Sequence, residues 1–157
     1  MNSKMKVVKT TSENPDFIAL ITALDKSLWE SYPELKSNYW GNNIIELNPN
    51  VVVIYLDEKP VACGCFKKYD KNTMEIKRMF VSPEARGLGL AKKILQELEL
   101  WAQELGFSFS VLETLYNQKE AISLYQKVGY AIVDNYEPYV GQENSICMKK
   151  EIGRMNN

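Results

Sequence analysis

The stretch Arg86-Gly87-Leu88-Gly89-Leu90-Ala91 has the residue types and spacing with the clearest chemical consequence in this chain. It follows an extended run at residues 74–81 and opens a long amphipathic run at residues 90–105. A glycine-containing turn between a strand and a helix leaves several main-chain N–H groups unpaired and pointing the same way, and the helix dipole adds partial positive charge there. Such a turn can bind an anion, most often a phosphate or pyrophosphate.

Two better-known phosphate loops do not fit this stretch. The P-loop pattern G-x-x-x-x-G-K-[ST] is absent. The dinucleotide pattern G-x-G-x-x-G is incomplete, because Lys92 stands where the third glycine is required. The connection at residues 82–85 is also too long for the tight dinucleotide turn. A plain strand-to-helix turn without a ligand is the alternative interpretation of the turn taken by itself.

The turn does fit the pattern R-x-x-G-x-A, read at Arg86, Gly89 and Ala91, behind the step Val81-x-Pro83. With the preceding strand, this pattern resembles motif A of the GCN5-related N-acetyltransferases, the GNAT superfamily. Further along the chain, Leu124-Tyr125-x-x-x-Gly129-Tyr130 resembles motif B of the same family. The resemblance runs from about residue 7 to residue 150.

Members of this family move an acetyl group from acetyl-CoA to an amine, which attacks the thioester directly without a covalent enzyme intermediate. The resemblance therefore implies an acyltransferase that uses acetyl-CoA and a primary amine on a small molecule, peptide or protein. The sequence does not identify the acceptor. The alternatives are a non-catalytic CoA-binding module or sensor, and a nucleotide-binding protein that uses the same turn. Dimers are common among members, so a homodimer is one expected oligomeric state.

The resemblance also assigns residues to the cofactor. The cofactor arm is expected to hydrogen-bond the end of the fourth strand, and the pyrophosphate to lie on the amides of the turn; the residues concerned are Met79, Phe80, Val81, Arg86, Gly87, Leu88, Gly89, Leu90, Ala91 and Lys92. Two of these are glycines, which allow close approach because they have no Cβ atom. Many members carry an asparagine seven residues before the motif B tyrosine, where this chain has Gln118 beside Asn117. Either side chain could contact the cofactor arm.

For the chemistry, the resemblance assigns Tyr125 to the departing thiolate, because a phenol can donate a proton to the leaving sulfur. By helical spacing alone, Tyr125 is a core residue. Glu75 and Glu113 occupy positions that carry the general base in two different branches of the family. Apolar neighbours would raise the pKa of either carboxyl toward a useful range. Each could equally face solvent on its strand, and a water chain could replace both as the base.

The acceptor site is expected among aromatic residues. Four of them gather around a weakly patterned segment at residues 34–47: Trp29, Tyr32, Tyr39 and Trp40. In the family this segment lines the acceptor site, although simple packing explains the same residues. Tyr136 and Tyr139 lie in the loop before the last strand, where the family often closes over the acceptor.

The chain contains no histidine, which excludes Ser-His-Asp and Cys-His catalysis. Any base must therefore be a carboxylate, a tyrosine, a lysine or a water that these residues hold. Cys63 and Cys65 point to one face of a strand and are expected to be small buried residues. No metal site is expected, because zinc ligands at suitable spacing are missing.

Hydrophobic periodicity and turn residues define the elements that must position these residues. Strands are expected at residues 6–10, 51–56, 61–69, 74–81, 107–115, 130–133 and 145–150. Helices are expected at residues 15–29, 90–105 and 119–128, with a short second helix or loop at 34–47. The fold class is α/β (α+β): a mixed, mostly antiparallel sheet of about seven strands flanked by about four helices, in the GNAT order. We expect a single domain over residues 1–152 and a frayed tail at 153–157.

Composition limits the class of protein. The 157 residues include 45% hydrophobic and 25% charged residues and carry a formal net charge of −1. This balance is typical of a soluble globular protein and argues against a general nucleic-acid binder. No apolar run is long enough to span a bilayer, and the first residues have no signal-peptide core. A cytoplasmic location without membrane association is therefore expected.

Overall fold

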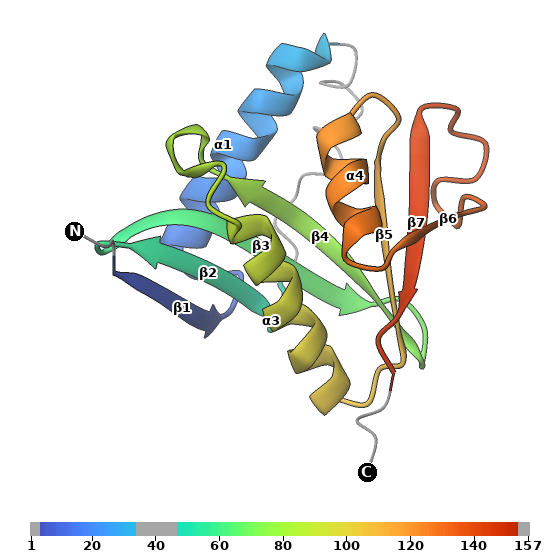
Figure 1. Cartoon of the computed structure of the whole chain (residues 1–157), viewed down its shortest axis with the longest axis horizontal. Coiled ribbons are helices and arrows are strands. Elements are labelled where there is room, and N and C mark those ends of the chain that lie inside the picture. The colour runs from blue at the N-terminus through green and yellow to red at the C-terminus, as the bar shows by residue number, and fades with distance from the viewer. Residues whose placement is uncertain (1–3, 34–46, 154–157) are drawn as a thin grey trace. The chain divides into compact units, whose positions relative to one another are not determined.

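The computed structural model describes residues 4–33 and 47–153. Its elements, in chain order, are β1 (Met5–Thr10), α1 (Pro15–Ser31), β2 (Val51–Leu56), β3 (Lys59–Lys68), β4 (Thr73–Val81), the 3-10 helix η2 (Pro83–Ala85), α3 (Leu90–Glu104), β5 (Phe109–Leu115), α4 (Lys119–Lys127), β6 (Ala131–Val133) and β7 (Ser145–Glu151) (Figure 1). The strands form a seven-stranded sheet in the order β1-β2-β3-β4-β5-β7-β6. The predicted mixed sheet is confirmed. Most of the predicted second helix or loop, with Tyr39 and Trp40, lies outside the described residues.

The chain divides into two compact units. The first unit comprises Met1–Phe66 and Arg78–Leu98, and the second comprises Lys67–Lys77 and Glu99–Asn157. The glycine turn belongs to the first unit, whereas both candidate base carboxylates and the motif B tyrosine belong to the second. The single domain expected over residues 1–152 stays a prediction.

In the first unit, α1 begins as its sequence predicts. The side chain of Asn14 caps the helix, accepting hydrogen bonds from the main-chain N–H groups of Asp16 at 2.8 Å and Phe17 at 3.2 Å. Pro15 follows at the first helical position, where its missing N–H costs nothing. The helix ends at Tyr32, whose N–H donates to the Leu28 carbonyl at 2.7 Å.

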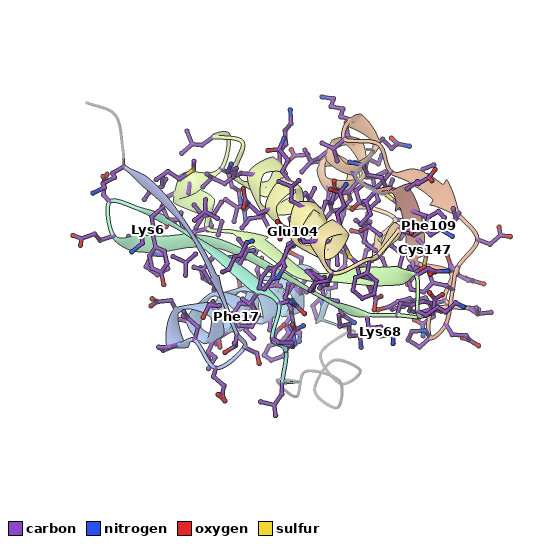
Figure 2. The ribbon with its side chains drawn as sticks, turned by 90° about the horizontal axis from the view of Figure 1, so that it is seen from below. Lys6, Phe17, Lys68, Glu104, Phe109 and Cys147 are labelled. Atoms are coloured by element: carbon purple, nitrogen blue, oxygen red, sulfur yellow. The ribbon has the colours of Figure 1, made fainter. Side chains whose placement is uncertain are left out.

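The core of the first unit depends on alternation along β3. Cys63 and Cys65 are buried in one cluster with Phe17 of α1. Figure 2 shows Phe17 on one side of the strands. The predicted common, buried face of the two cysteines is therefore confirmed. Gly64 points the other way, and a Cβ atom there would lie 2.7 Å from Cγ2 of Ile94 on α3. The absence of a side chain at Gly64 lets α3 pack closely on that face.

In the second unit, β5 runs parallel to β4 and antiparallel to β7. The β4–β5 ladder pairs only Thr73 to Glu75 of β4 with Phe109 to Val111 of β5. The β5–β7 ladder, in contrast, runs the whole length of both strands, from Phe109 opposite Glu151 to Leu115 opposite Ser145. Beyond Glu75, therefore, β4 and β5 do not pair with each other.

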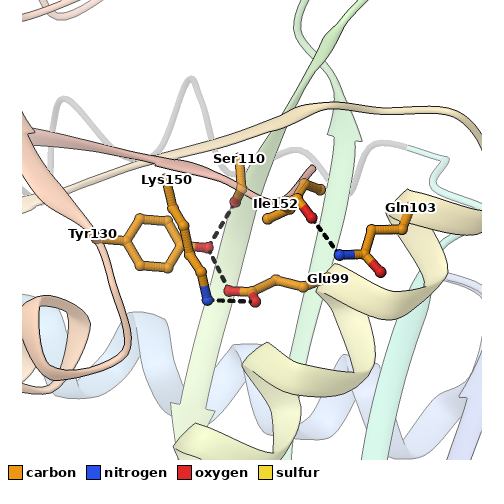
Figure 3. Close-up of polar contacts among 6 residues, drawn as sticks. All are labelled: Glu99, Gln103, Ser110, Tyr130, Lys150 and Ile152. Atoms are coloured by element: carbon orange, nitrogen blue, oxygen red, sulfur yellow. Dashed lines mark hydrogen bonds and ion pairs between the residues drawn. The ribbon is translucent and has the colours of Figure 1, made fainter. Parts of the chain in front are cut away.

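A buried polar network holds α3 against this part of the sheet (Figure 3). The Tyr130 hydroxyl lies 2.7 Å from Ser110 Oγ and donates to Glu99 Oε2 at 3.0 Å. The Lys150 ammonium donates to Glu99 Oε1 at 2.8 Å. Because both carboxylate oxygens of Glu99 have donors, its burial on α3 is compensated. Gln103 of the same helix donates to the Ile152 carbonyl.

Three local predictions were inaccurate. The connection between the strands expected at residues 51–56 and 61–69 is only two residues long. Asp57 and Glu58 both take positive φ values, 49° and 69°, and Lys59 already pairs with Leu56. Such a two-residue turn matches the twist of the flanking strands. Leu105, expected as the last residue of the helix at residues 90–105, follows the end of α3 and is 55% exposed. The connection after β4 contains the unexpected 3-10 helix η2.

Candidate active site

The glycine turn in the first unit leaves its main chain accessible. Gly87 and Gly89 have φ values of 83° and 77°, in the left-handed region that favours glycine. A Cβ atom built on either residue would meet no other atom within 4 Å. Ala85 and Leu90, 3% and 5% exposed, fix the two ends of the turn in the core. The exposed main chain between them precedes the first turn of α3.

Arg86 connects this turn to the end of β4. Its Nε donates to the Val81 carbonyl at 3.1 Å, so two residues assigned to the cofactor by resemblance contact each other. The side chains of Met79 and Phe80 are used in packing: Met79 reaches the α3 side of Gly64, and Phe80 joins the α1 cluster. What these strand residues can offer a ligand is therefore their main chain.

Just before this segment, β4 contains an irregularity that the sequence did not predict. Arg78 has a φ of 61°, which is unusual for a residue other than glycine. Its guanidinium pairs with the Asp25 carboxylate of α1 at 2.7 Å, and its carbonyl accepts from Cys63 Sγ at 3.4 Å. Burial raises the pKa of Asp25, and the Arg78 charge opposes that shift. These contacts hold the strand in a conformation that alternation alone does not indicate.

In the second unit, the buried carboxylate of Glu75 has close polar neighbours. The Tyr136 hydroxyl donates to Glu75 Oε2 at 2.8 Å, and Lys77 Nζ lies 4.0 Å from Oε1. Lys77 also donates to the Tyr139 hydroxyl at 3.4 Å. The Glu75 side chain is only 4% exposed, which excludes a solvent-facing position on the strand.

Glu113 lies on the same face of the sheet. Glu75 is paired with Val111, and Glu113 follows Val111 by two residues, which is one strand repeat. Ser145 Oγ donates to Glu113 Oε2 at 2.7 Å. Burial raises the pKa of Glu113, the Glu75 charge adds to the rise, and Ser145 and Lys77 oppose it.

The loop between β6 and β7 brings aromatic rings to this cluster. The Tyr136 ring makes edge contacts with Tyr69 at 5.0 Å and Tyr139 at 5.5 Å between centroids. Asn135 Nδ2 shapes the loop by donating to the Tyr139 and Gln142 carbonyls, both at 3.1 Å. Burial and the Glu75 charge raise the pKa of Tyr136, so its hydroxyl remains a hydrogen-bond donor.

Tyr125, on α4, lies on the opposite face of the sheet from these carboxylates. Its ring packs against Tyr130, whose hydroxyl bonds Ser110. Ser110 and Val111 are adjacent on β5, so their side chains point to opposite faces of the sheet. Tyr125 is 9% exposed, and burial raises its pKa to about 12. Within residues 4–33 and 47–153, no side chain or main-chain group hydrogen-bonds its hydroxyl.

Comparison with known proteins decides the family. A model of the "Acetyltransferase (GNAT) family" matches residues 18–130. The chain belongs to this family. It is 32% identical over 138 residues to the IAA acetyltransferase of Azospirillum brasilense, covering 86% of this chain and 90% of that relative.

Solved structures share the GNAT fold. A Klebsiella pneumoniae structure assigned to the acyl-CoA N-acyltransferases has a TM-score of 0.77 at 28% identity, over 94% of this chain and 97% of that one. The PaiA N-acetyltransferase of Thermoplasma acidophilum, solved in complex with coenzyme A, has a TM-score of 0.71 at 18% identity, over 94% of this chain and 99% of that one. The predicted GNAT membership and fold are therefore confirmed.

The remaining predicted site residues of this GNAT protein occupy element ends. Gln118 is the N-cap residue of α4 but makes no side-chain capping bond, and Asn117 before it is exposed. Trp29 and Tyr32, both half-buried, lie at the end of α1 in the first unit. Lys92 is exposed in the first turn of α3. Their roles stay predictions.

The structure brings Glu75, Glu113, Tyr136 and Tyr139 together and adds Lys77, which sequence reasoning missed. The available signal was its spacing, because Lys77 follows Glu75 by two residues on one strand and so shares its face. In the described ranges 4–33 and 47–153, no group of three or more His, Cys, Asp or Glu residues is arranged to hold a metal ion. No helix of the described part is long and apolar enough to cross a membrane.

Proposed function

We propose that this GNAT protein is an N-acetyltransferase that moves an acetyl group from acetyl-CoA to a primary amine. The observation that carries the proposal is the accessible main chain at Gly87 and Gly89, at the start of α3, in a chain of this family. A diphosphate fits there because no Cβ atom blocks the amides and the helix dipole favours negative charge. The coenzyme A in the PaiA relative supports the same choice of ligand.

The chain's residues would hold this ligand mainly through the backbone. The amides from Gly87 to Lys92 would bind the diphosphate, and the main chain of Met79 to Val81 would bind the cofactor arm. Arg86, already bonded to Val81, would keep the strand end and the turn in fixed positions. When bound, acetyl-CoA supplies an acetyl group activated as a thioester.

The acceptor amine must lose a proton as its nitrogen bonds to the acetyl carbon, and the breaking C–S bond leaves a thiolate. Glu75 or Glu113, directly or through a water, would take the amine's proton. Tyr125 would donate its proton to the sulfur. A phenol with a pKa of about 12 is protonated at neutral pH, and no group among the described residues holds the Tyr125 hydroxyl.

The acceptor would approach from the carboxylate side. Tyr136 and Tyr139 would cover it there, and two acidic side chains, Glu75 buried and Glu113 half-buried, favour the binding of a cationic amine. Trp29 and Tyr32 are further candidates for the acceptor pocket. Tyr125 and the carboxylates lie on opposite faces of the sheet, which suits a reaction in which the proton donor and the proton acceptor serve two different atoms, the departing sulfur and the amine nitrogen.

The test is a screen of amines in which release of free CoA thiol from acetyl-CoA is followed. Thiol release that depends on one class of amine, with the acetylated amine identified by mass spectrometry, supports the proposal. Calorimetry with CoA and with ATP runs in parallel. Binding of CoA without amine-dependent release would favour a CoA-binding module or sensor, and binding of ATP alone would favour a nucleotide-binding protein.

A further inference from the structure

Lys77 brings a positive charge into the second unit's cluster of candidate site residues, where proton transfer gives it no task. Its ammonium lies 4.0 Å from Glu75 Oε1 and donates to the Tyr139 hydroxyl at 3.4 Å. Its charge also acts on Glu113. The Lys77 side chain is 37% exposed, so a ligand that enters from solvent can reach it. The ammonium is therefore placed to contact an acceptor that approaches the two carboxylates.

A second lysine points to the same face of the sheet. The chain stays paired just past the end of β3, because the Tyr69 N–H donates to the Thr73 carbonyl at 2.8 Å. The Tyr69 ring contacts Tyr136, whose hydroxyl bonds Glu75. Lys67, which is half-buried, precedes Tyr69 by two residues and so shares its face. We call four residues the mixed-charge face: Lys67, Lys77, Glu75 and Glu113.

The mixed-charge face limits the charge of a ligand that can bind there. The formal charges of its four side chains cancel, two against two. A ligand with one cationic amine would add positive charge without compensation, and a diamine would add more. An amine that also carries a carboxylate brings both signs, so each group can pair with a side chain of opposite charge. Since charges removed from water are stabilised only when they are paired, the face fits a zwitterion best.

We propose that Lys77 is a specificity-determining residue that binds a carboxylate on the acceptor, so that the acceptor is an amine which also carries a carboxylate, as a free amino acid does. The amine lies toward Glu75 and Glu113, and the carboxylate lies toward Lys77. Lys67 adds positive charge on the same face. This inference rests on the proposed acetyl transfer, but the charges that carry it are present in the protein without a ligand.

The first test compares matched acceptors by thiol release from acetyl-CoA. Each primary amino acid is paired with the amine that lacks its carboxylate and with its carboxamide, and diamines and dipeptides complete the panel. In the parent, kcat/KM for the preferred amino acid should exceed that for its decarboxylated amine by about ten-fold or more, the value of one charge-assisted hydrogen bond. In Lys77→Met this ratio should fall toward one through a higher KM for the amino acid. Lys77→Arg keeps the charge and should keep most of the preference.

Lys68→Met is the matched control. Lys68 is exposed and adjacent to Lys67 on β3, so its side chain points to the opposite face, and the ratio should stay at the parent value. The proposal is wrong if the parent acetylates decarboxylated amines, diamines or dipeptides as well as it acetylates amino acids. It is also wrong if Lys77→Met lowers kcat/KM equally for the amino acid and its amine, since Lys77 then only balances the neighbouring carboxylates. Lys77→Gln replaces Lys77→Met if thermal melts show that the latter does not fold.

Binding separates this inference from the proposed function. Calorimetry with the amino acids and their decarboxylated amines is run on the parent and on Lys77→Met, with CoA present and absent. The preferred amino acid should bind the parent about ten-fold or more tightly than its amine, and the difference should vanish in Lys77→Met. If no amine is acetylated, the proposed function fails, but this difference in affinity still supports the inference. A parent protein that binds no amino acid overturns it.

Discussion

Tyr125 and Tyr130 pack ring against ring, with centroids 6.0 Å apart, but their hydroxyl groups are in opposite situations. Tyr130 is bonded to Ser110 and Glu99, whereas the Tyr125 hydroxyl has no hydrogen-bond partner anywhere in the described chain. These two tyrosines are five positions apart, and removal of the hydroxyl group should therefore affect activity at one and stability at the other.

Tyr125→Phe is expected to lower kcat for acetyl transfer by about 100-fold or more, the usual contribution of a general acid. The melting temperature should change little, because the hydroxyl stabilises nothing among the described residues. Tyr130→Phe is the paired control. It should lower the free energy of unfolding by about 1–3 kcal/mol, because buried partners lose a hydrogen bond. Steady-state kinetics and thermal melts of both variants check this, and an unchanged kcat in Tyr125→Phe would contradict the role of acid.

Gly89→Ala is expected to weaken CoA binding roughly ten-fold or more, because the new Cβ atom enters the open side of the turn and strains its amides. Gly106→Ala is a matched control at the other end of α3. Gly106 also has a positive φ, 96°, and open space around it. Both variants should lose about 1–2 kcal/mol of stability from left-handed strain.

Calorimetry with CoA and with pantetheine separates the two effects of Gly89→Ala. Pantetheine lacks the diphosphate, so its affinity should be nearly the same for the parent and the variant. Equal losses for both ligands, or a similar loss of CoA affinity in Gly106→Ala, would mean that the turn does not bind the diphosphate.

Glu113→Gln is expected to stabilise the protein at neutral pH. Because burial raises the pKa of Glu113, the folded state holds the proton more tightly than the unfolded chain, and parent stability falls as pH rises through the folded-state pKa. The amide carries no charge and can still accept from Ser145. Thermal melts should show a melting temperature a few degrees above that of the parent at pH 7, since 1 kcal/mol corresponds to about 2–4 °C for a chain of this size. The difference should vanish near pH 4.

The exposed Glu143 provides the comparison for that measurement. Glu143→Gln removes a carboxylate that is already in water, so its melting temperature should stay within about 1–2 °C of the parent at both pH values. A Glu113→Gln variant that gained stability equally at pH 4 and pH 7 would point to packing and not to the ionisation of the carboxyl.

Asp25 and Arg78 should show energetic coupling. Each single alanine variant leaves a largely buried charge without its partner, since the side chains are 13% and 18% exposed. We expect losses of about 2–4 kcal/mol for each and a smaller loss in the double variant than the sum, with a coupling of about 1–3 kcal/mol in a double-mutant cycle. Additive losses in urea unfolding would show that the ion pair does not hold the β4 irregularity.

Local signals predicted most of the fold. Asn14-Pro15 correctly predicted the start of α1, and the apolar run from Val51 to Leu56 predicted both ends of β2. Four residues of that strand are 0% exposed, as expected for a strand buried on both faces. These elements were predictable because capping residues and hydrophobic periodicity act over a few neighbouring positions.

The candidate site was less predictable because it depends on contacts between distant positions. Tyr136 and Glu75 are 61 residues apart, and no local pattern indicates that one donates to the other. Likewise, the positive φ of Arg78 follows from Asp25 and Cys63, which come from other elements. The sequence suggested the residue types of the site, but only tertiary structure could pair them.

All three cysteines of the chain, Cys63, Cys65 and Cys147, are buried, at 0%, 5% and 0% exposure. A chromogenic disulfide reagent added to the native protein should therefore react with almost none of its own sulfur atoms. Colour that develops during turnover would report product alone, whereas a stoichiometric burst approaching three equivalents per chain would reveal that the sample has denatured.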